Sequence, residues 1–330
     1  MKKYFTIVFI LFFMCAGSTV CVCKVAYCQD TRIKPDEFAG ELSGFGVKVT
    51  VGNYYFIKRV ISVFGTRWGQ APATDVEFED RTWEQLLLSY EAFRRDITVS
   101  KDELEQEVSK TLKSEKVAFD WQNDKAAYDT WLKEKTGETS ELFENQLRHL
   151  IQLEKLRQQV LDTFKPSVTE AEAYQEFLNE YNTLELELVA FDEKKDADAF
   201  YAKMRDPALW DEASKKDQKF GKHPGFVSLE FLINMWKIPK DDLYKMLDLE
   251  VNSIYPPIPV YKGYGVIRIL KKRLANKEDF PKLRDSYLKQ VEMIKKYDEL
   301  NGWLGKLKAE AKILVYPKPA AAEIKPGKTN

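Results

Sequence analysis

An amphipathic stretch near the C-terminus constrains the fold of this chain more than any other feature. From Phe280 onward apolar residues recur at helical spacing, as one stripe made of Leu283, Tyr287, Val291, Ile294, Tyr297, Leu300, Leu304, Leu307 and Ala311. A helix cannot bury such a stripe alone, because most helical stability in proteins comes from packing an apolar face against other elements. The nearest apolar helical surface lies before residue 182. We therefore expect this helix to return to it.

The end of the same stretch carries three further signals. Gly302 and Gly305 fall inside the predicted helix, where a glycine costs about 1 kcal/mol relative to alanine, so we expect a bend or close packing there. Residues 312–316 are predicted to form a short strand. The Pro- and Ala-rich sequence after Pro317 is typical of a flexible tail.

Residues 82–182 carry the helices that this stretch would meet. Capping-box spacing, which marks helix starts, occurs in three pairs: Thr82 with Gln85, Ser100 with Glu103, and Thr169 with Glu172. We expect helices over residues 83–95, from 100 to about 121, and from 139 to the residue before Pro166. His149 lies off the apolar stripe of the last helix, so we expect a solvated side chain rather than a ligand.

The segment before these helices has the pattern of mixed structure. Val47, Val49 and Val51 alternate with polar residues, which predicts a strand. Gly52 and Asn53 form a turn signal, so residues 54–64 could be a returning strand. Residues 65–80 are predicted to be loop.

Between the two helical regions the pattern changes to mixed α and β structure. Leu184, Leu186 and Leu188 alternate with glutamates, which predicts a half-buried strand. Short helices are expected at about 196–204 and 208–216, a Gly/Pro loop over 221–225, a helix from Pro239, and strands near 254–260 and 263–271. The fold class predicted is therefore α+β, with an α+β domain inserted into a discontinuous helical domain.

The first residues have the form of an export signal. Lys2 and Lys3 precede an apolar stretch, and Ala26 and Cys28 stand at −3 and −1 of a cut before Gln29. We expect residues 1–28 to be a cleaved signal peptide that directs the protein to the periplasm or cell envelope. A membrane anchor through residues 4–23 stays open, because about 20 uncharged apolar residues can span a bilayer. A lipoprotein signal is less favoured, since no cysteine here follows Gly, Ala or Ser.

Composition excludes several classes of function. All four cysteines lie in the leader, so a cut chain has neither disulfide nor thiol nucleophile. The 51 basic and 52 acidic side chains nearly balance and form no basic stripe, which argues against nucleic acid as a partner. The two histidines, His149 and His223, are too few for an ordinary zinc site, so we expect no metal. No phosphate loop, nucleotide fingerprint or catalytic triad is evident, so no cofactor is expected.

Six segments carry a resemblance to a known family. In chain order they are ITVSKDELEQEV, VTEAEAYQEFLNEYN, LWDEASKKD, GKHPGF, LEVNSIYPPIPVYKGYGVIRI and WLGKLKAEAKILVYP. Together they resemble the SurA/PrsA family of envelope foldases, in which a helical chaperone domain carries a parvulin-type (PpiC-like, rotamase) prolyl cis-trans isomerase domain. The resemblance covers roughly residues 80–317. It implies a SurA-N-like helical domain over 29–180, a parvulin-like domain over 181–275, a helix and strand over 276–317 that complete the first domain, and a tail over 318–330.

The chain departs from the family at the residues that matter for isomerisation. Parvulins place two histidines on facing central strands around the proline pocket. By resemblance the first belongs near Glu187 or Leu188 and the second at Gly265, and none of these is histidine. His223 falls in the loop before the pocket and does not restore the pair. Asn252 stands where the family's closing turn has glycine. We identify no catalytic residue and expect weak or no isomerase activity.

The same resemblance places the apolar wall of the proline pocket on five residues. They are Met235, Trp236, Leu243, Tyr244 and Met246. Methionine and aromatic side chains suit adaptable peptide-binding surfaces, so these residues are our candidates for substrate binding. Ordinary core packing is the alternative for each of them.

These observations predict an exported chaperone or foldase that binds unfolded or extended client polypeptides. Binding is expected in a cleft between the helical domain and the parvulin-like domain. Two alternatives stay open: a working prolyl isomerase with an atypical site, and a membrane-tethered scaffold without chaperone activity. A homodimer also stays open.

Overall fold

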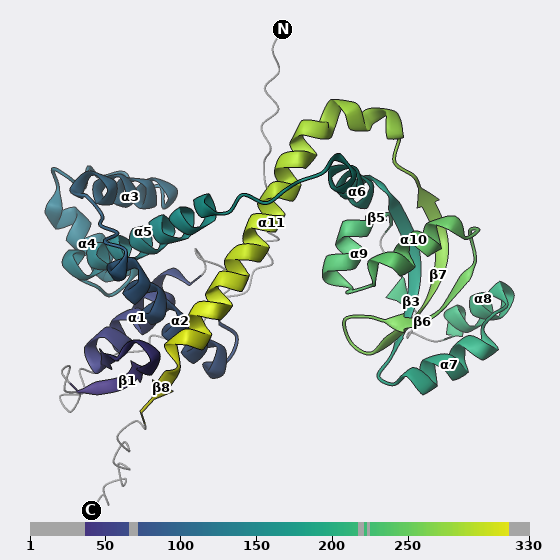
Figure 1. The fold of residues 1–330 in the computed structure, drawn as a ribbon, viewed down its shortest axis with the longest axis horizontal. Helices are drawn as coiled ribbons and strands as arrows, with labels where there is room; N and C mark the ends of the chain where they lie inside the picture. The colour runs from purple at the N-terminus through teal and green to yellow at the C-terminus, as the bar shows by residue number, and fades with distance from the viewer. Residues whose placement is uncertain (1–36, 66–71, 217–220, 223–224, 317–330) are drawn as a thin grey trace, which may run out of the picture. The chain divides into compact units, whose positions relative to one another are not determined.

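The computed structural model describes residues 37–65, 72–216, 221–222 and 225–316. Among these residues the chain forms two compact units. The first comprises the residues up to Leu86 together with those from Ile313 onward, and the second runs from Leu87 to Lys312. Helices and antiparallel sheets follow one another along the chain as they do in an α+β fold. The predicted fold class is therefore confirmed (Figure 1).

The first unit is built on a three-stranded antiparallel sheet. Its strands are β1 (Phe38–Leu42), β2 (Val47–Thr50) and β8 (Ile313–Val315), in the order β2-β1-β8. A short 3-10 turn, η1 (Ser43–Phe45), joins β1 to β2. The predicted strands around Val47 and at residues 312–316 are thus confirmed. The last strand pairs directly with the first, through Gly40 opposite Val315 and Leu42 opposite Ile313.

The strand expected at residues 54–64 is wrong, because this segment is the helix α1 (Val51–Phe64). The Thr50 side chain accepts a hydrogen bond from the Asn53 N–H and caps the helix, so the supposed turn at Gly52 and Asn53 is its first turn. Its buried residues are spaced at three and four, as Tyr54, Ile57, Val60, Ile61 and Phe64. The helical period therefore outweighed the β propensity of these residues.

Helix α2 (Asp75–Arg94) begins earlier than expected, inside the segment predicted to be loop. The Thr74 hydroxyl accepts from the Glu77 N–H at 3.1 Å, and this pair supplies the start of the helix. Thr82, expected as the cap, lies in the helix interior, where its hydroxyl donates to the Phe78 carbonyl at 2.7 Å. The boundary between the two units falls within this helix, after Leu86.

Three further helices form the helical part of the second unit. They are α3 (Lys101–Ser114), α4 (Lys125–Lys135) and α5 (Ser140–Thr163). Ser100 and Glu103 form the predicted capping box at the start of α3, which ends at Ser114 rather than near residue 121. Helix α5 has the predicted limits and is capped by Thr139. It contacts α3, α4 and α11, so it is covered on several sides.

His149 is buried rather than solvated, which corrects the sequence expectation. Its exposed fraction is 8%, and its Nδ1 lies 3.4 Å from the Ser89 hydroxyl of α2. Burial lowers the pKa of the imidazole to about 4, so the side chain is neutral at physiological pH. The expectation failed because α5 buries more than the single stripe that its sequence pattern shows.

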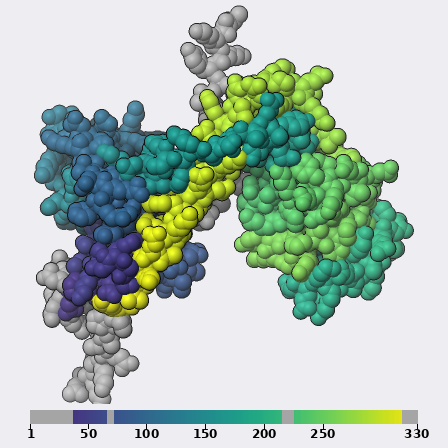
Figure 2. Space-filling model, viewed as in Figure 1, coloured from purple at the N-terminus to yellow at the C-terminus, as the bar shows by residue number. Residues whose placement is uncertain are grey.

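The long C-terminal helix, α11 (Phe280–Ala311), returns to the early helices as predicted. Its Leu300 and Trp303 pack on a buried cluster made of Ala92 of α2, Ile97 of the following loop, and Leu156 and Val160 of α5. The Arg95 guanidinium lies over the Trp303 ring at 5.8 Å. A Cβ at Gly302 or Gly305 would meet nothing within 4 Å, so the close packing suggested for these glycines is not found. Figure 2 shows α11 as a long run of surface atoms.

The first turns of α11 pack against α6 (Glu170–Tyr181), which starts with the predicted capping box of Thr169 and Glu172. Phe177 has no exposed surface and lies in contact with the rings of Phe280 and Tyr287. The Tyr287 hydroxyl donates to Glu180 at 2.5 Å, and Lys295 of α11 pairs with Glu172 at 2.6 Å. This aromatic cluster joins the two chain segments that flank the inserted domain.

The inserted domain is a five-stranded antiparallel sheet with helices on both faces. The strands are β3 (Thr183–Phe191), β4 (Gly221–Lys222), β5 (Val227–Ser228), β6 (Ile254–Pro259) and β7 (Tyr264–Arg273). The order is β4-β3-β7-β6, and β5 pairs with β3. The three long strands lie where the sequence predicts them, while residues 221–222 pair with β3 instead of forming loop.

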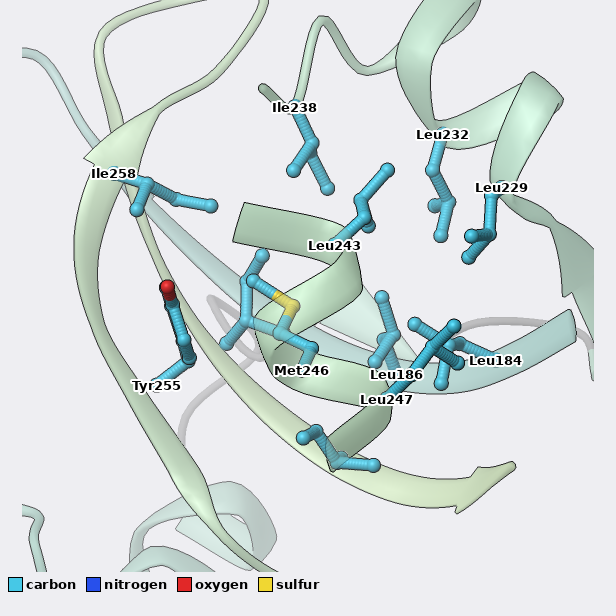
Figure 3. Packing of buried hydrophobic residues seen from close by; sticks show 12 residues of the cluster. Leu184, Leu186, Leu229, Leu232, Ile238, Leu243, Met246, Leu247, Tyr255 and Ile258 are labelled. Carbon is cyan, nitrogen blue, oxygen red and sulfur yellow. The ribbon is translucent and has the colours of Figure 1, made fainter. Parts of the chain in front are cut away.

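Helices cover the two faces of this sheet separately. On one face α9 (Leu229–Met235), which the sequence pattern did not reveal, and α10 (Lys240–Asp248) enclose a core that Figure 3 shows from close by. On the other face α7 (Lys194–Lys203) and α8 (Pro207–Lys216) enclose a smaller cluster around Trp210. A short 3-10 turn, η2 (Lys277–Asp279), leads from β7 into α11.

Within the described residues no helix has both the length and the apolar character needed to cross a bilayer. The predicted leader over residues 1–28 and the predicted tail over 318–330 lie outside the described residues.

Candidate functional site

The two positions to which the family resemblance assigns the parvulin histidines, near Leu188 and at Gly265, come together on the sheet. Strands β3 and β7 are antiparallel partners, with Leu188 opposite Ile267 and Ala190 opposite Gly265. A Cβ built on Gly265 would lie 2.5 Å from Leu188 Cδ1 and 2.8 Å from Val260 Cγ1. The side chains of Leu188 and Val260 therefore occupy the space above Gly265.

This site is apolar, which limits the chemistry that its side chains can perform. Leu188 and Val260 pack against the core shown in Figure 3, and Gly265 offers no side chain. The side chains here cannot donate a hydrogen bond to a twisted amide or exchange a proton with it. His223 lies outside the described residues. In the part of the chain that the structure describes, no group of three or more His, Cys, Asp or Glu is placed to hold a metal ion.

A buried polar network that the sequence analysis missed lies on the opposite face of β3 and β7. Arg268 of β7 is only 6% exposed. Its Nη1 lies 3.7 Å from Glu187 Oε2 of β3 and forms an ion pair with Asp211 of α8. Trp210 donates its indole N–H to the same glutamate oxygen at 2.7 Å. A buried charge is destabilising unless a charge of opposite sign lies beside it. The contacts of Arg268 with Glu187 and Asp211 therefore fix β7 to β3 and α8.

Asn252 completes this network in the turn before β6. Its φ of 72° is left-handed, a conformation that asparagine tolerates better than most residues and that explains its place where the family has glycine. Its Oδ1 accepts a hydrogen bond from Arg268 Nη2 at 3.1 Å. The sequence signal for the network was a charged residue, Arg268, inside the apolar run from Val266 to Leu270.

The five candidate pocket-wall residues fall into two groups. Leu243 and Met246 have no exposed surface and belong to the core of the α9–α10 face. Trp236 and Tyr244 pack at the edge of that core and are partly exposed, and Met235 is 59% exposed. The Tyr244 hydroxyl donates to Asn179 Oδ1 of α6 at 2.7 Å, and burial raises its pKa to about 12. Tyr244 thus connects α10 to α6.

Exposed apolar side chains gather at the end of α9 and in the β6–β7 turn. Phe231 and Met235 are one helical turn apart on α9, and the Tyr261 N–H donates to the Trp236 carbonyl at 2.7 Å. Tyr261 is 66% exposed and Phe231 40%. We call Phe231, Met235, Trp236 and Tyr261 the apolar rim. It is a surface suited to apolar contact with a polypeptide.

Comparisons with known proteins return solved structures only. Neither a family model nor a curated protein matches the chain. PrsA, a peptidylprolyl isomerase from Bacillus anthracis, is similar at 14% identity over 72% of this chain and 97% of its own, with a TM-score of 0.39. A SurA-like chaperone of Campylobacter jejuni matches at 13% identity, over 83% of this chain and 96% of its own, with a TM-score of 0.35.

A third structure, PrsA from Bacillus cereus, matches at 14% identity, over 84% of this chain and 92% of its own, with a TM-score of 0.35. The names of these three structures, PrsA and SurA-like chaperone, are those of the family that the six sequence segments resemble.

Replacing Gly265 with alanine is expected to lower the free energy of unfolding by about 1–3 kcal/mol, because the added methyl group overlaps Leu188 and Val260. Urea unfolding followed by circular dichroism measures this. Adding Leu188→Ala to Gly265→Ala should cost less than the sum of the two single changes, since the two side chains share one space. Gly302→Ala is the matched control: it meets open space in a helix interior and should stabilise by up to about 1 kcal/mol. Additive effects of Gly265→Ala and Leu188→Ala would contradict this packing.

Proposed function

We propose that this protein is an exported chaperone or foldase of SurA/PrsA type whose parvulin-like domain binds polypeptides without catalysing prolyl isomerisation. The observation that carries the proposal is the apolar filling at Leu188 and Gly265. A prolyl isomerase must stabilise a twisted amide against a barrier of roughly 18–20 kcal/mol, which calls for a hydrogen-bonding network around the carbonyl. Leucine above glycine supplies none.

The proposed clients are unfolded or extended polypeptides in the periplasm or cell envelope. The leader predicted over residues 1–28 would export the protein to that compartment. We assign client contact to the apolar rim, which adds Phe231 and Tyr261 to the candidates Met235 and Trp236. Leu243, Tyr244 and Met246 would act beneath it as support. Binding of this kind lowers the free concentration of aggregation-prone segments and needs neither metal nor cofactor. The domain limits given by the family resemblance, with the parvulin-like domain over 181–275, are part of the proposal.

The proposal is tested by two assays on the same purified chain. With a proline-containing tetrapeptide, the rate of cis-trans exchange should rise by less than about threefold, which corresponds to under 1 kcal/mol of barrier. With a client that aggregates on dilution from denaturant, an equimolar amount should suppress light scattering. Exchange accelerated by orders of magnitude would instead establish an isomerase with an atypical site, and an unchanged scattering curve would favour the scaffold alternative.

A variant pair locates the client surface within the same scattering assay. The double change Met235→Ser and Tyr261→Ser removes two exposed apolar side chains and should raise the amount needed for half suppression about tenfold. Leu209→Ser is the matched control, because Leu209 is 47% exposed on α8, across the sheet from the rim. Equal loss in both variants would place client contact elsewhere.

A further inference from the structure

Backbone hydrogen bonds hold the apolar rim in place. The Tyr261 N–H donates to the Trp236 carbonyl at 2.7 Å, which joins the β6–β7 turn to the end of α9. The Val260 N–H donates to the Gly263 carbonyl at 3.1 Å and closes that turn around Tyr261 and Lys262. Gly263 has a φ of 83°, a conformation that glycine adopts at little cost. The rim is therefore a preorganised surface, which loses little conformational entropy when a ligand binds.

Three lysines stand at this end of the rim. Lys237 follows Trp236 directly, and Lys240 begins α10 three residues later. Lys262 follows Tyr261, and its Nζ lies 5.7 Å from the centre of the Tyr261 ring. All three lysines are exposed. Because Trp236 and Tyr261 are joined by a hydrogen bond, lysines from two chain segments lie beside the same exposed apolar side chains.

These lysines are not neutralised by nearby carboxylates. None of them forms an ion pair in the part of the chain that the structure describes. Asp242 of α10 instead accepts from the Tyr255 hydroxyl at 2.9 Å and pairs with Lys245 at 3.5 Å. Exposed Asp241 offsets part of the positive charge, and Glu230 lies in the first turn of α9, at the other end of that helix. The end of the rim at Trp236 is thus left with an excess of positive charge.

Local structure disfavours two of the three lysines. Lys237 has a φ of 57°, a left-handed conformation that glycine adopts more readily than a residue with a Cβ. The next residue, Ile238, is buried in the core of Figure 3, so this tight turn is fixed. Lys240 stands in the first turn of α10, where the helix dipole favours acidic side chains. Locally disfavoured residues are concentrated at functional sites, so these two positions point to a role in binding.

The neighbouring edge strand restricts how a polypeptide can bind at the rim. Strand β6 stands at the end of the sheet order β4-β3-β7-β6. Three of its six residues are Pro256, Pro257 and Pro259, which have no N–H to donate. The edge is therefore poorly suited to pairing with a further strand. Side-chain contacts remain as the main way to hold an extended polypeptide here.

We propose that the apolar rim selects client segments in which aromatic or apolar residues are flanked by aspartate or glutamate. The apolar side chains contact Met235, Trp236 and Tyr261, and the carboxylates pair with Lys237 and Lys262. Charge complementarity of this kind determines the choice among ligands more than it determines affinity. The preference rests on the proposed function and deepens it, since it gives the class of client segment that the same surface takes.

Three blocked heptapeptides test this preference. Each has Phe-Ala-Phe at its centre and two glutamates, two glutamines or two lysines on either side, with an uncharged coumarin label for fluorescence anisotropy. At about 50 mM salt the full chain should bind the glutamate peptide about fivefold more tightly than the glutamine peptide, as expected for exposed ion pairs. The lysine peptide should bind most weakly. At about 500 mM salt the difference should fall below about twofold, because salt screens exposed charges.

The outcomes distinguish failure of this preference from failure of the proposed function. Equal binding of the glutamate and glutamine peptides, or tighter binding of the lysine peptide, would overturn the preference and leave suppression of scattering as it is. Tight glutamate binding without suppression of scattering would support the preference and refute the chaperone activity. No binding of any peptide by a chain that suppresses scattering would overturn the preference and place client contact away from the rim.

Other occupants of the rim have results of their own. Displacement of the bound glutamate peptide by phosphatidylglycerol vesicles, but not by phosphatidylcholine vesicles, would overturn the proposal and assign the lysines to a membrane surface. A homodimer that Lys262→Gln dissociates, measured by sedimentation, would overturn it and assign them to a second copy of this chain. Neither effect is expected.

A pair of glycine variants separates a role in binding from a role in folding. Lys237→Gly should weaken binding of the glutamate peptide about threefold and leave the glutamine peptide unchanged. Lys116→Gly is the matched control, because Lys116 is also left-handed, with a φ of 56°, and exposed just after the end of α3. Neither change should lower the urea midpoint of unfolding, since glycine adopts this conformation freely. Equal affinities of the two variants for the glutamate peptide would overturn the role of Lys237.

Discussion

Arg268→Met is expected to lower the free energy of unfolding by about 3–5 kcal/mol, the effect of removing one partner from a buried ion pair. The change leaves the Glu187 carboxylate, 8% exposed, with the Trp210 indole N–H as a donor but without the neighbouring guanidinium. It also removes the bonds from Arg268 to Asp211 and Asn252. Urea unfolding followed by circular dichroism measures the loss.

Two further variants distinguish a buried-charge effect from simple loss of packing. Lys271→Met removes a pair on the same strand, with Glu185 at 2.9 Å, but Lys271 is mostly exposed, so the cost should stay below about 1 kcal/mol. Adding Glu187→Gln to Arg268→Met removes the buried charge that has lost its partner. The glutamine keeps a side-chain oxygen that can accept from the Trp210 indole N–H, so much of the lost stability should return. A double variant no more stable than Arg268→Met alone would argue against the buried charge as the cause.

Phe177→Ala is expected to lower the free energy of unfolding by about 3–5 kcal/mol, as for other fully buried phenylalanines. Its ring lies 5.6 Å from that of Phe280 and 5.7 Å from that of Tyr287, so truncation opens a cavity between α6 and α11. Hydrogen exchange should show lost protection in both helices, and urea unfolding gives the total.

Tyr181→Ala is the control for this change. Tyr181 sits on the same helix, with its ring 4.9 Å from Phe177, but it is 45% exposed, so its loss should cost about 1 kcal/mol or less. If the two variants were equally stable, Phe177 would not be the centre of the junction.

The fold was predictable from the sequence where local chemistry and periodicity agree. The capping boxes at Ser100 and Thr169 and the strand alternation at Leu184 act within a few residues, and each was found where expected. Thr82 has the same spacing as Ser100 but lies inside a helix, because Thr74 and Glu77 start that helix eight residues earlier. A local pattern cannot tell which of two nearby starts is used.

The candidate site was only partly predictable, because it depends on strand register. That Leu188 and Gly265 would lie near each other came from the family resemblance, whereas their contact depends on a shift in pairing between Glu185 and Leu186. The network of Arg268 joins β3, β7, α8 and the turn at Asn252, which are far apart in sequence.

The pairing of β8 with β1 has a consequence for biosynthesis. Tyr316 donates its hydroxyl to Glu41 at 3.0 Å, across 275 residues of chain. The ribosome makes the early residues long before the late ones, so β1 and β2 lack their third strand, β8, while everything between is synthesised. Contacts with such a separation form slowly. During synthesis the edge of β1 that will pair with β8 therefore has no partner strand.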